Sequence, residues 1–89
     1  MFIEFDPIKE ASNSAKHGVS LAEAEELDWD SMVIKRDDRH VYGEQRFIGY
    51  ALKEDRLYCI VFTERGAQRR VISLRKANER EVRRYVTEN

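Results

Sequence analysis

The chain has 89 residues, of which 42% are hydrophobic and 37% charged, and this length predicts one domain spanning residues 1–89. No apolar run approaches the roughly 20 residues of a membrane-spanning helix, the N-terminus lacks a signal-peptide pattern, and the single cysteine excludes an internal disulfide. We therefore expect a soluble cytoplasmic protein, whose net charge of −1 hides a strong asymmetry along the chain.

The first segment with a clear helical pattern covers residues 7–17. Asp6 and Pro7 are typical of an N-cap and a first helical position, and Gly18 is typical of a left-handed C-cap. Helical spacing places small apolar residues on one face, namely Ile8, Ala11 and Ala15, and polar residues on the opposite face, namely Lys9, Asn13 and Lys16. We expect the apolar face to pack on a sheet and the polar stripe to face solvent.

The residues that follow predict a second helix. Ser20 and Glu23 have the spacing of a capping box, in which two side chains satisfy backbone N–H groups at a helix start. We therefore expect a helix over residues 21–28. Trp29 follows it and is expected to anchor this helix to the core.

The middle of the chain changes to the alternating pattern of β-strands. We predict four strands, over residues 32–36, 46–52, 57–63 and 69–74, joined by short turns. The third is apolar or aromatic on both sides, which is typical of a central strand. Its Cys59 is expected to be an inert core residue.

A second capping-box pattern, Asn78 with Glu81, predicts a C-terminal helix that runs to about residue 87. Three of its residues share one side and are expected to pack against the domain, namely Val82, Tyr85 and Val86. The element order predicts an α+β fold with two N-terminal helices, an antiparallel meander of about four strands and a C-terminal helix. The apolar residues before Asp6 are compatible with a further short strand.

Charge is distributed unevenly along the sequence. Residues 1–31 carry eight acidic residues against two basic ones, and residues 65–84 carry eight basic residues against two acidic ones. Seven of these eight basic residues are arginines, the side chain suited to bidentate phosphate contacts. The pattern favours a polyanionic partner, and the alternative is a solvated face paired with the acids of the same chain.

Several classes of site have no support in the sequence. No cysteine or histidine pair has zinc-ligand spacing, no acidic loop resembles a calcium site, and the scattered glycines form no phosphate-binding loop. No serine lies in the context of a nucleophile elbow. We therefore expect neither a metal ion nor a cofactor.

The remaining residues suit cleavage of RNA without a metal, which needs proton-transfer groups near the 2′-hydroxyl and cations over the phosphate. His17 and Glu44 are the candidates for proton transfer. Each has an alternative interpretation: His17 as a helix C-terminal residue favoured by the helix dipole, and Glu44 as a loop acid that pairs with Arg46. His40 is expected to be solvated. Three tyrosines could stack a base where exposed, namely Tyr42, Tyr50 and Tyr58.

Four segments in order resemble the BrnT family of toxin proteins. They are F-D-P-I-K-E-A-S-N-S-A-K-H-G-V-S at residues 5–20, G-E-Q-R at 43–46, T-E-R-G at 63–66, and R-V-I-S-L-R-K-A at 70–77 followed by E-x-x-x-Y at 81–85. The similarity covers essentially the whole chain. Phe5, where the family often has tryptophan, and Leu74, where it usually has a small residue, depart from the pattern, and the strand after Arg46 is shorter.

The resemblance implies a RelE-like fold and a ribonuclease activity that arrests growth by cutting RNA. It also implies a cognate antitoxin, a ribbon-helix-helix protein, and contact with operator DNA only through the toxin–antitoxin complex. No membrane partner is implied. The positions that match the family's motifs are Lys9, Asn13, Lys16, His17, Glu44, Arg46, Arg65, Arg75 and Lys76.

These considerations predict a metal-independent endoribonuclease toxin with Glu44 as general base and His17 as the alternative base or the acid. Lys16, Arg46 and Arg65 are expected to stabilise the charge that develops on the phosphorane. Further contacts to RNA are assigned to six residues, namely Lys9, Asn13, Arg69, Arg75, Lys76 and Arg80. The alternative function is a non-catalytic module that binds nucleic acid or protein through its arginine-rich face. The C-terminal arginines could also serve as the docking surface for the antitoxin.

Overall fold

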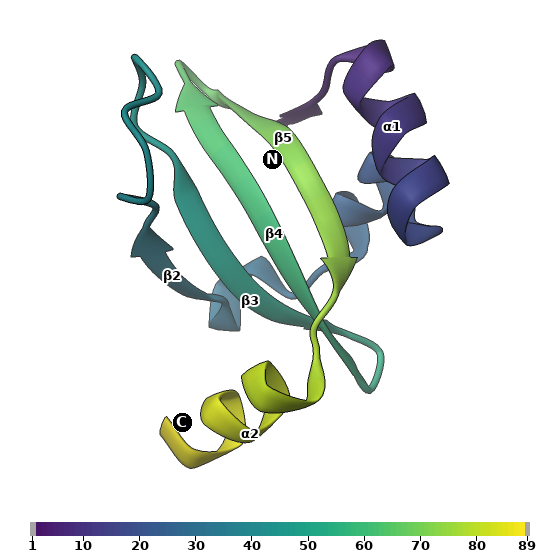
Figure 1. The fold of residues 1–89 in the computed structure, drawn as a ribbon, viewed down its shortest axis with the longest axis vertical. Coiled ribbons are helices and arrows are strands. Elements are labelled where there is room, and N and C mark those ends of the chain that lie inside the picture. The colour runs from purple at the N-terminus through teal and green to yellow at the C-terminus, as the bar shows by residue number, and fades with distance from the viewer. Residues whose placement is uncertain (1, 89) are drawn as a thin grey trace.

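The computed structural model describes residues 2–88. In chain order its elements are β1 (Phe2–Glu4), α1 (Pro7–His17), the 3₁₀ helices η1 (Leu21–Glu26) and η2 (Trp29–Ser31), β2 (Val33–Arg36), β3 (Phe47–Lys53), β4 (Arg56–Arg65), β5 (Gln68–Lys76) and α2 (Glu79–Glu88). The strands form one five-stranded sheet in the order β1-β5-β4-β3-β2 (Figure 1). No helix within the described residues is long and apolar enough to cross a membrane.

The predicted meander is confirmed, since β2 to β5 pair as antiparallel neighbours. Two details of the prediction were wrong. The sheet has five strands because β1 pairs with β5, in parallel, with Ile3 opposite Arg69. The second N-terminal element is the pair of 3₁₀ helices η1 and η2 in place of an α-helix. Between them the Asp28 N–H donates to the Leu52 carbonyl of β3, 2.9 Å away, and is therefore not available to a helical carbonyl.

The core lies on one face of the sheet, between the strands and η1. Its five largest fully buried side chains are Phe62, Leu21, Ile60, Leu74 and Val71. Trp29 packs edge-on against Phe62, with ring centroids 5.2 Å apart, which confirms its predicted anchoring role. Gly49 belongs to this layer because any Cβ at that position would collide with the Met32 sulfur.

The helix α1 has the predicted bounds and the predicted caps. The Asp6 carboxylate accepts a hydrogen bond from the Ile8 N–H, and Gly18 ends the helix with a φ of 68°, a conformation that glycine adopts without strain. The predicted packing through the apolar residues was wrong, whereas Lys9 and Lys16 are exposed as predicted. The apolar residue Ile8 is 79% exposed, and Asn13 is the buried residue of the helix.

Asn13 explains how α1 packs against the sheet. Its side-chain amide donates to the Leu74 carbonyl at 2.8 Å and accepts from the Leu74 N–H at 3.1 Å. A third bond runs from the amide to the Val19 carbonyl at 2.9 Å. The side chain therefore pairs with β5 as another strand would, and it satisfies buried backbone groups that cannot be left without partners.

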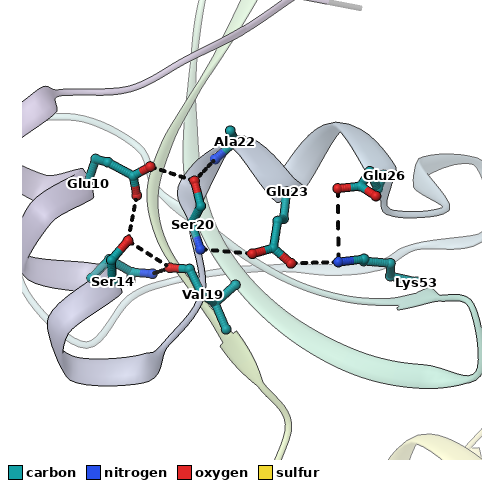
Figure 2. A network of polar contacts seen from close by, with 9 residues as sticks. Glu10, Ser14, Val19, Ser20, Ala22, Glu23, Glu26 and Lys53 are labelled. Atoms are coloured by element: carbon teal, nitrogen blue, oxygen red, sulfur yellow. Dashed lines mark hydrogen bonds and ion pairs between the residues drawn. The ribbon is translucent and has the colours of Figure 1, made fainter.

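A chain of polar contacts continues from α1 to the sheet (Figure 2). The Glu10 carboxylate accepts from the Ser20 hydroxyl at 2.5 Å and from the Leu21 N–H at 2.9 Å. The predicted capping box of Ser20 and Glu23 is formed, and Lys53 of β3 donates to Glu23 at 2.5 Å. These contacts fix α1 and η1 to each other and to β3.

The C-terminal helix α2 is attached differently. It has no buried residue, and Figure 1 shows it projecting past the end of the sheet. The predicted packing of Val82 and Val86 was wrong, since their side chains are 37% and 71% exposed. The Glu81 carboxylate holds the helix through two bonds from Arg75, both 2.8 Å, and one from the Tyr50 hydroxyl at 3.1 Å.

The two faces of the sheet therefore differ. Because side chains alternate along a strand, Ile60 and Phe62 point into the core. Their neighbours on β4 point to the opposite side, which we call the second face, namely Cys59, Val61, Thr63 and Arg65. Arg75, paired with Cys59 in the register, lies on the same side, and α2 reaches this face at one end through Glu81.

Candidate active site

A cluster of one carboxylate and two guanidinium groups forms at the edge of the second face. Glu44 lies in the loop before β3, Arg46 directly precedes β3, and Arg65 ends β4. The Arg46 Nε lies 3.3 Å from Glu44 Oε2, and the Arg65 Nη2 lies 3.1 Å from Glu44 Oε1. The pairing of Glu44 with Arg46 is the alternative that the sequence left open, and Arg65 joins it from a different strand.

The loop that carries Glu44 is fixed by Asp37. The buried Asp37 carboxylate accepts from the Arg39 Nε at 2.7 Å and Nη2 at 2.8 Å, and from the Tyr42 hydroxyl at 3.1 Å. The Asp37 N–H donates to the Arg46 carbonyl at 2.8 Å. The Arg39 guanidinium holds the pKa of Asp37 well below its usual range, so this hub stays ionised near neutral pH.

The electrostatics of the cluster suit an anion. Hydrogen bonds from Arg65, and then from Arg46, lower the pKa of Glu44, so its carboxylate is ionised at neutral pH and is less basic than an ordinary glutamate. The Arg46 guanidinium also lies over the Tyr42 ring, 4.1 Å from its centroid. Two guanidinium groups held by one carboxylate and one ring are preorganised to bind the oxygens of a phosphate.

A second group of predicted residues lies on α1. Lys9, Lys16 and His17 line a cavity of about 180 Å³ together with Ile72 and Ser73 of β5. Burial, and then the charges of Lys16 and Arg75, lower the pKa of His17. Its imidazole is therefore neutral at pH 7, which is the state of a proton acceptor.

The five predicted catalytic residues thus form two groups. Glu44, Arg46 and Arg65 touch one another, whereas Lys16 and His17 belong to α1. Figure 1 shows α1, in dark violet and blue, and the teal loop between β2 and β3 at opposite edges of the sheet. The structure brings His17 within electrostatic reach of Arg75.

The residues predicted to bind RNA are dispersed. Arg69 lies on the core side, 4.5 Å from the Trp29 ring centroid, and Arg75 is bound to Glu81. Lys76 and Arg80 are exposed near the start of α2, and Lys9 is exposed on α1. The buried amide of Asn13 is fully engaged with Val19 and Leu74, so we assign it a structural role in place of an RNA contact.

Sequence reasoning missed two features near the site. Arg70 lies opposite Thr63 in the register and forms ion pairs with Glu4 at 3.5 Å and Asp6 at 4.0 Å. The alternation of side chains along the predicted strand is the signal that could have placed Arg70 on the second face with Arg65. The Asp37 hub was also missed, because its partners Arg39 and Tyr42 follow it in a loop without periodicity. Of the three tyrosines considered for stacking, Tyr58 is buried in the core.

Fold and site together define a class: a small α+β protein with a carboxylate held between two arginines at one edge of its sheet. Within the described residues, no group of histidine, cysteine or acidic side chains is arranged to hold a metal ion. The chain belongs to the BrnT family, because the family model described as "Ribonuclease toxin, BrnT, of type II toxin-antitoxin system" matches residues 5–81. This confirms the resemblance seen in the motifs. None of the curated proteins matches the chain.

Membership carries a coarse functional statement. The family consists of ribonuclease toxins of type II toxin–antitoxin systems, so RNA is the substrate class and an antitoxin is the partner that the family implies. The family match does not identify the residues that perform the reaction.

Proposed function

We propose that this protein is a metal-independent endoribonuclease that arrests growth in the cytoplasm and is neutralised by a cognate antitoxin. The observation that carries the proposal is the Glu44 carboxylate held between Arg46 and Arg65 at the edge of the second face. In a chain of a ribonuclease toxin family, such a cluster is suited to a scissile phosphate. A RelE-like fold is part of the same proposal.

The proposed reaction is an internal transfer at phosphorus. The 2′-hydroxyl of one nucleotide loses its proton and attacks the adjacent phosphate, and the 5′-oxygen of the next nucleotide leaves with a proton. The products are a 2′,3′-cyclic phosphate and a 5′-hydroxyl. Arg46 and Arg65 would bind the phosphate oxygens and stabilise the extra negative charge of the phosphorane.

Glu44 is the proposed base because it is ionised and lies beside both arginines. Phosphate oxygens would compete with Glu44 for these arginines. Loss of the hydrogen bonds from the arginines would raise the basicity of the Glu44 carboxylate. His17 remains the alternative base or the acid, with Lys16 beside it. The neutral imidazole of His17 supports this role. Glu44 is preferred because it contacts Arg46 and Arg65 directly, whereas His17 lies on α1.

The test is cleavage of purified, ribosome-free RNA in excess EDTA, with the products examined for cyclic phosphate ends. We expect Glu44→Gln to lose about 10²–10⁴-fold in rate and Arg46→Ala or Arg65→Ala about 10²–10³-fold. Arg56→Ala, an exposed arginine at the opposite end of β4, is the matched control and should cut like the wild type. Near-complete activity in Glu44→Gln and Arg46→Ala would contradict the assignment.

The same experiment separates the alternative function. A non-catalytic module would bind RNA with a strong dependence on salt and generate no new ends, and Glu44→Gln would have no special effect. Expression in cells provides a second test. The protein made alone should stop growth, and an antitoxin supplied with it should restore growth.

We further propose that the antitoxin is a ribbon-helix-helix protein, that operator DNA is bound only through the complex, and that α2 is the docking surface. The helix presents two exposed arginines, Arg80 and Arg83, beside the exposed apolar residues Val82 and Val86. Exposed apolar residues with a charged border are typical of a protein-binding surface.

A further inference from the structure

A second cavity adjoins the cluster of Glu44 and Arg46. It has a volume of about 350 Å³, and its lining includes Arg36, Asp38, His40, Tyr42 and Gln45 in addition to these two residues. Ligand pockets in proteins begin at roughly 300 Å³, so the space suits a small group such as one nucleobase. The lining comes from a single stretch of chain, the loop between β2 and β3 and its borders.

This stretch is rigidly held. Asp37 binds Arg39 and Tyr42 from within the loop, and the Thr63 hydroxyl of β4 donates to the Gln45 carbonyl at 2.7 Å. These bonds fix the loop on both sides of the cavity. A preformed cavity spares a ligand the entropic cost of ordering its site.

Two aromatic rings border the cavity. His40 packs edge-on against Tyr42, with ring centroids 5.6 Å apart and an interplanar angle of 81°. One face of the Tyr42 ring carries the Arg46 guanidinium, so Tyr42 connects the cavity to the phosphate-binding cluster. His40 is exposed, which leaves its ring accessible to a ligand.

We propose that this cavity binds the base of a nucleotide next to the scissile phosphate, and that the base stacks on His40. The proposal rests on the ribonuclease function proposed above. A base is tethered to its phosphate through one sugar, so a phosphate held by Arg46 and Arg65 brings a neighbouring base to this cavity. Unpaired RNA bases stack on aromatic side chains, histidine included, whereas a base within a duplex is not available. The substrate is therefore single-stranded at the cut.

The test is a double-mutant cycle between the protein and the RNA. The cut is first mapped with the wild type. Oligonucleotides are then made uncleavable by a 2′-deoxy sugar at the cut, and each of two versions lacks one of the bases that flank it. Binding to the wild type, to His40→Ala and to His40→Phe is measured by fluorescence anisotropy. Phe2→Ala, which removes an exposed ring on β1, is the matched control.

Loss of a stacked base costs roughly tenfold in affinity. For one of the two positions, we expect removal of the base to weaken the wild type by about that factor and to have no effect on His40→Ala. His40→Phe should bind like the wild type, because it retains a ring that can stack. Phe2→Ala should bind like the wild type and remain sensitive to removal of the base.

Two results would overturn the inference in distinguishable ways. If the wild type cuts RNA but His40→Ala and base removal act independently at both positions, the base does not stack on His40 and the ribonuclease function stands. If the wild type neither cuts nor binds RNA, the proposed function and this inference fall together.

Discussion

The two α-helices of this protein are both amphipathic in sequence, and they are attached to the sheet by different means. In α1 the buried residue is polar, because Asn13 forms three buried hydrogen bonds to backbone groups. In α2 no residue is buried, and the Glu81 carboxylate binds Arg75 and Tyr50 of the sheet. The comparison teaches that an apolar stripe does not determine which face of a helix packs.

The difference has an energetic side. A buried amide that satisfies backbone groups at a sheet edge leaves those groups unpaired when it is removed, and each such group costs about 1–3 kcal/mol. A partly exposed ion pair contributes less, because water and salt screen it. We therefore expect α1 to belong to the cooperative unit of the domain and α2 to open locally at a lower free energy.

The largest effect on stability is expected from removal of the Asn13 side-chain amide. Asn13→Ala leaves the N–H and carbonyl of Leu74 and the carbonyl of Val19 without their partner. We expect the free energy of unfolding to fall by about 3 kcal/mol, measured by urea denaturation. Ile8→Ala in the same helix removes an exposed apolar side chain and should change stability by less than about 0.5 kcal/mol. A larger loss in Ile8→Ala than in Asn13→Ala would mean that α1 packs through its apolar face.

A smaller effect is expected at the anchor of α2. Glu81→Gln removes the charge that binds Arg75 and weakens the bond from Tyr50, so we expect a loss of about 1–2 kcal/mol. Amide hydrogen exchange should accelerate in α2 and stay unchanged in α1. Glu79→Gln, an exposed acid in the first turn of the same helix, should leave the exchange pattern as it is. Uniform acceleration across the sheet in Glu81→Gln would contradict local opening.

Acid should reproduce part of that effect. The Arg75 guanidinium, with the Asn78 N–H and the Tyr50 hydroxyl, lowers the pKa of Glu81 from 4.5 to about 2. A folded-state pKa below the unfolded value adds stability above pH 4.5, and that stability is lost as the pH falls towards 2. Between pH 5 and pH 2.5 the difference in unfolding free energy between the wild type and Glu81→Gln should shrink by about 1 kcal/mol. A constant difference would show that the charge of Glu81 contributes nothing.

The smallest effect on stability is expected from the exposed side of α2. Arg80→Ala combined with Arg83→Ala should change the free energy of unfolding by less than about 0.5 kcal/mol and leave cleavage of free RNA intact. Rescue of growth by the antitoxin should be weakened, because the proposed docking surface has lost two charges. Full rescue together with impaired cleavage would instead place these arginines in the RNA site.

The sequence predicted most of the fold where the signal is local. The strands β2 to β5 follow from alternation, and the caps of α1 and η1 from short motifs such as Asp6-Pro7 and Ser20 with Glu23. The errors concern long-range contacts. The pairing of β1 with β5 and the bonds of Asn13 to Leu74 join distant parts of the chain. The spacing of residues within α1 does not indicate that one of them binds a strand of the sheet.

The candidate site shows the same division. The contact of Glu44 with Arg46 follows from their spacing, since residues two apart on an extended chain share a side. Arg65 was placed with them by the family resemblance, and the structure brings it to Glu44 from β4. The hub of Asp37, Arg39 and Tyr42 was not predicted, because a buried carboxylate in an irregular loop has no pattern that distinguishes it from a solvated one.

The contact between Asn13 and β5 also limits where another strand could pair with β5. On one side of the sheet, β1 covers Gln68 to Arg70 of β5 and becomes the edge strand, and the Asn13 amide covers Leu74 further along. The other side ends in β2, whose four residues are all exposed. The part of β5 that β1 does not reach is therefore closed to a strand from another molecule at Leu74, whereas β2 presents its backbone at the opposite edge.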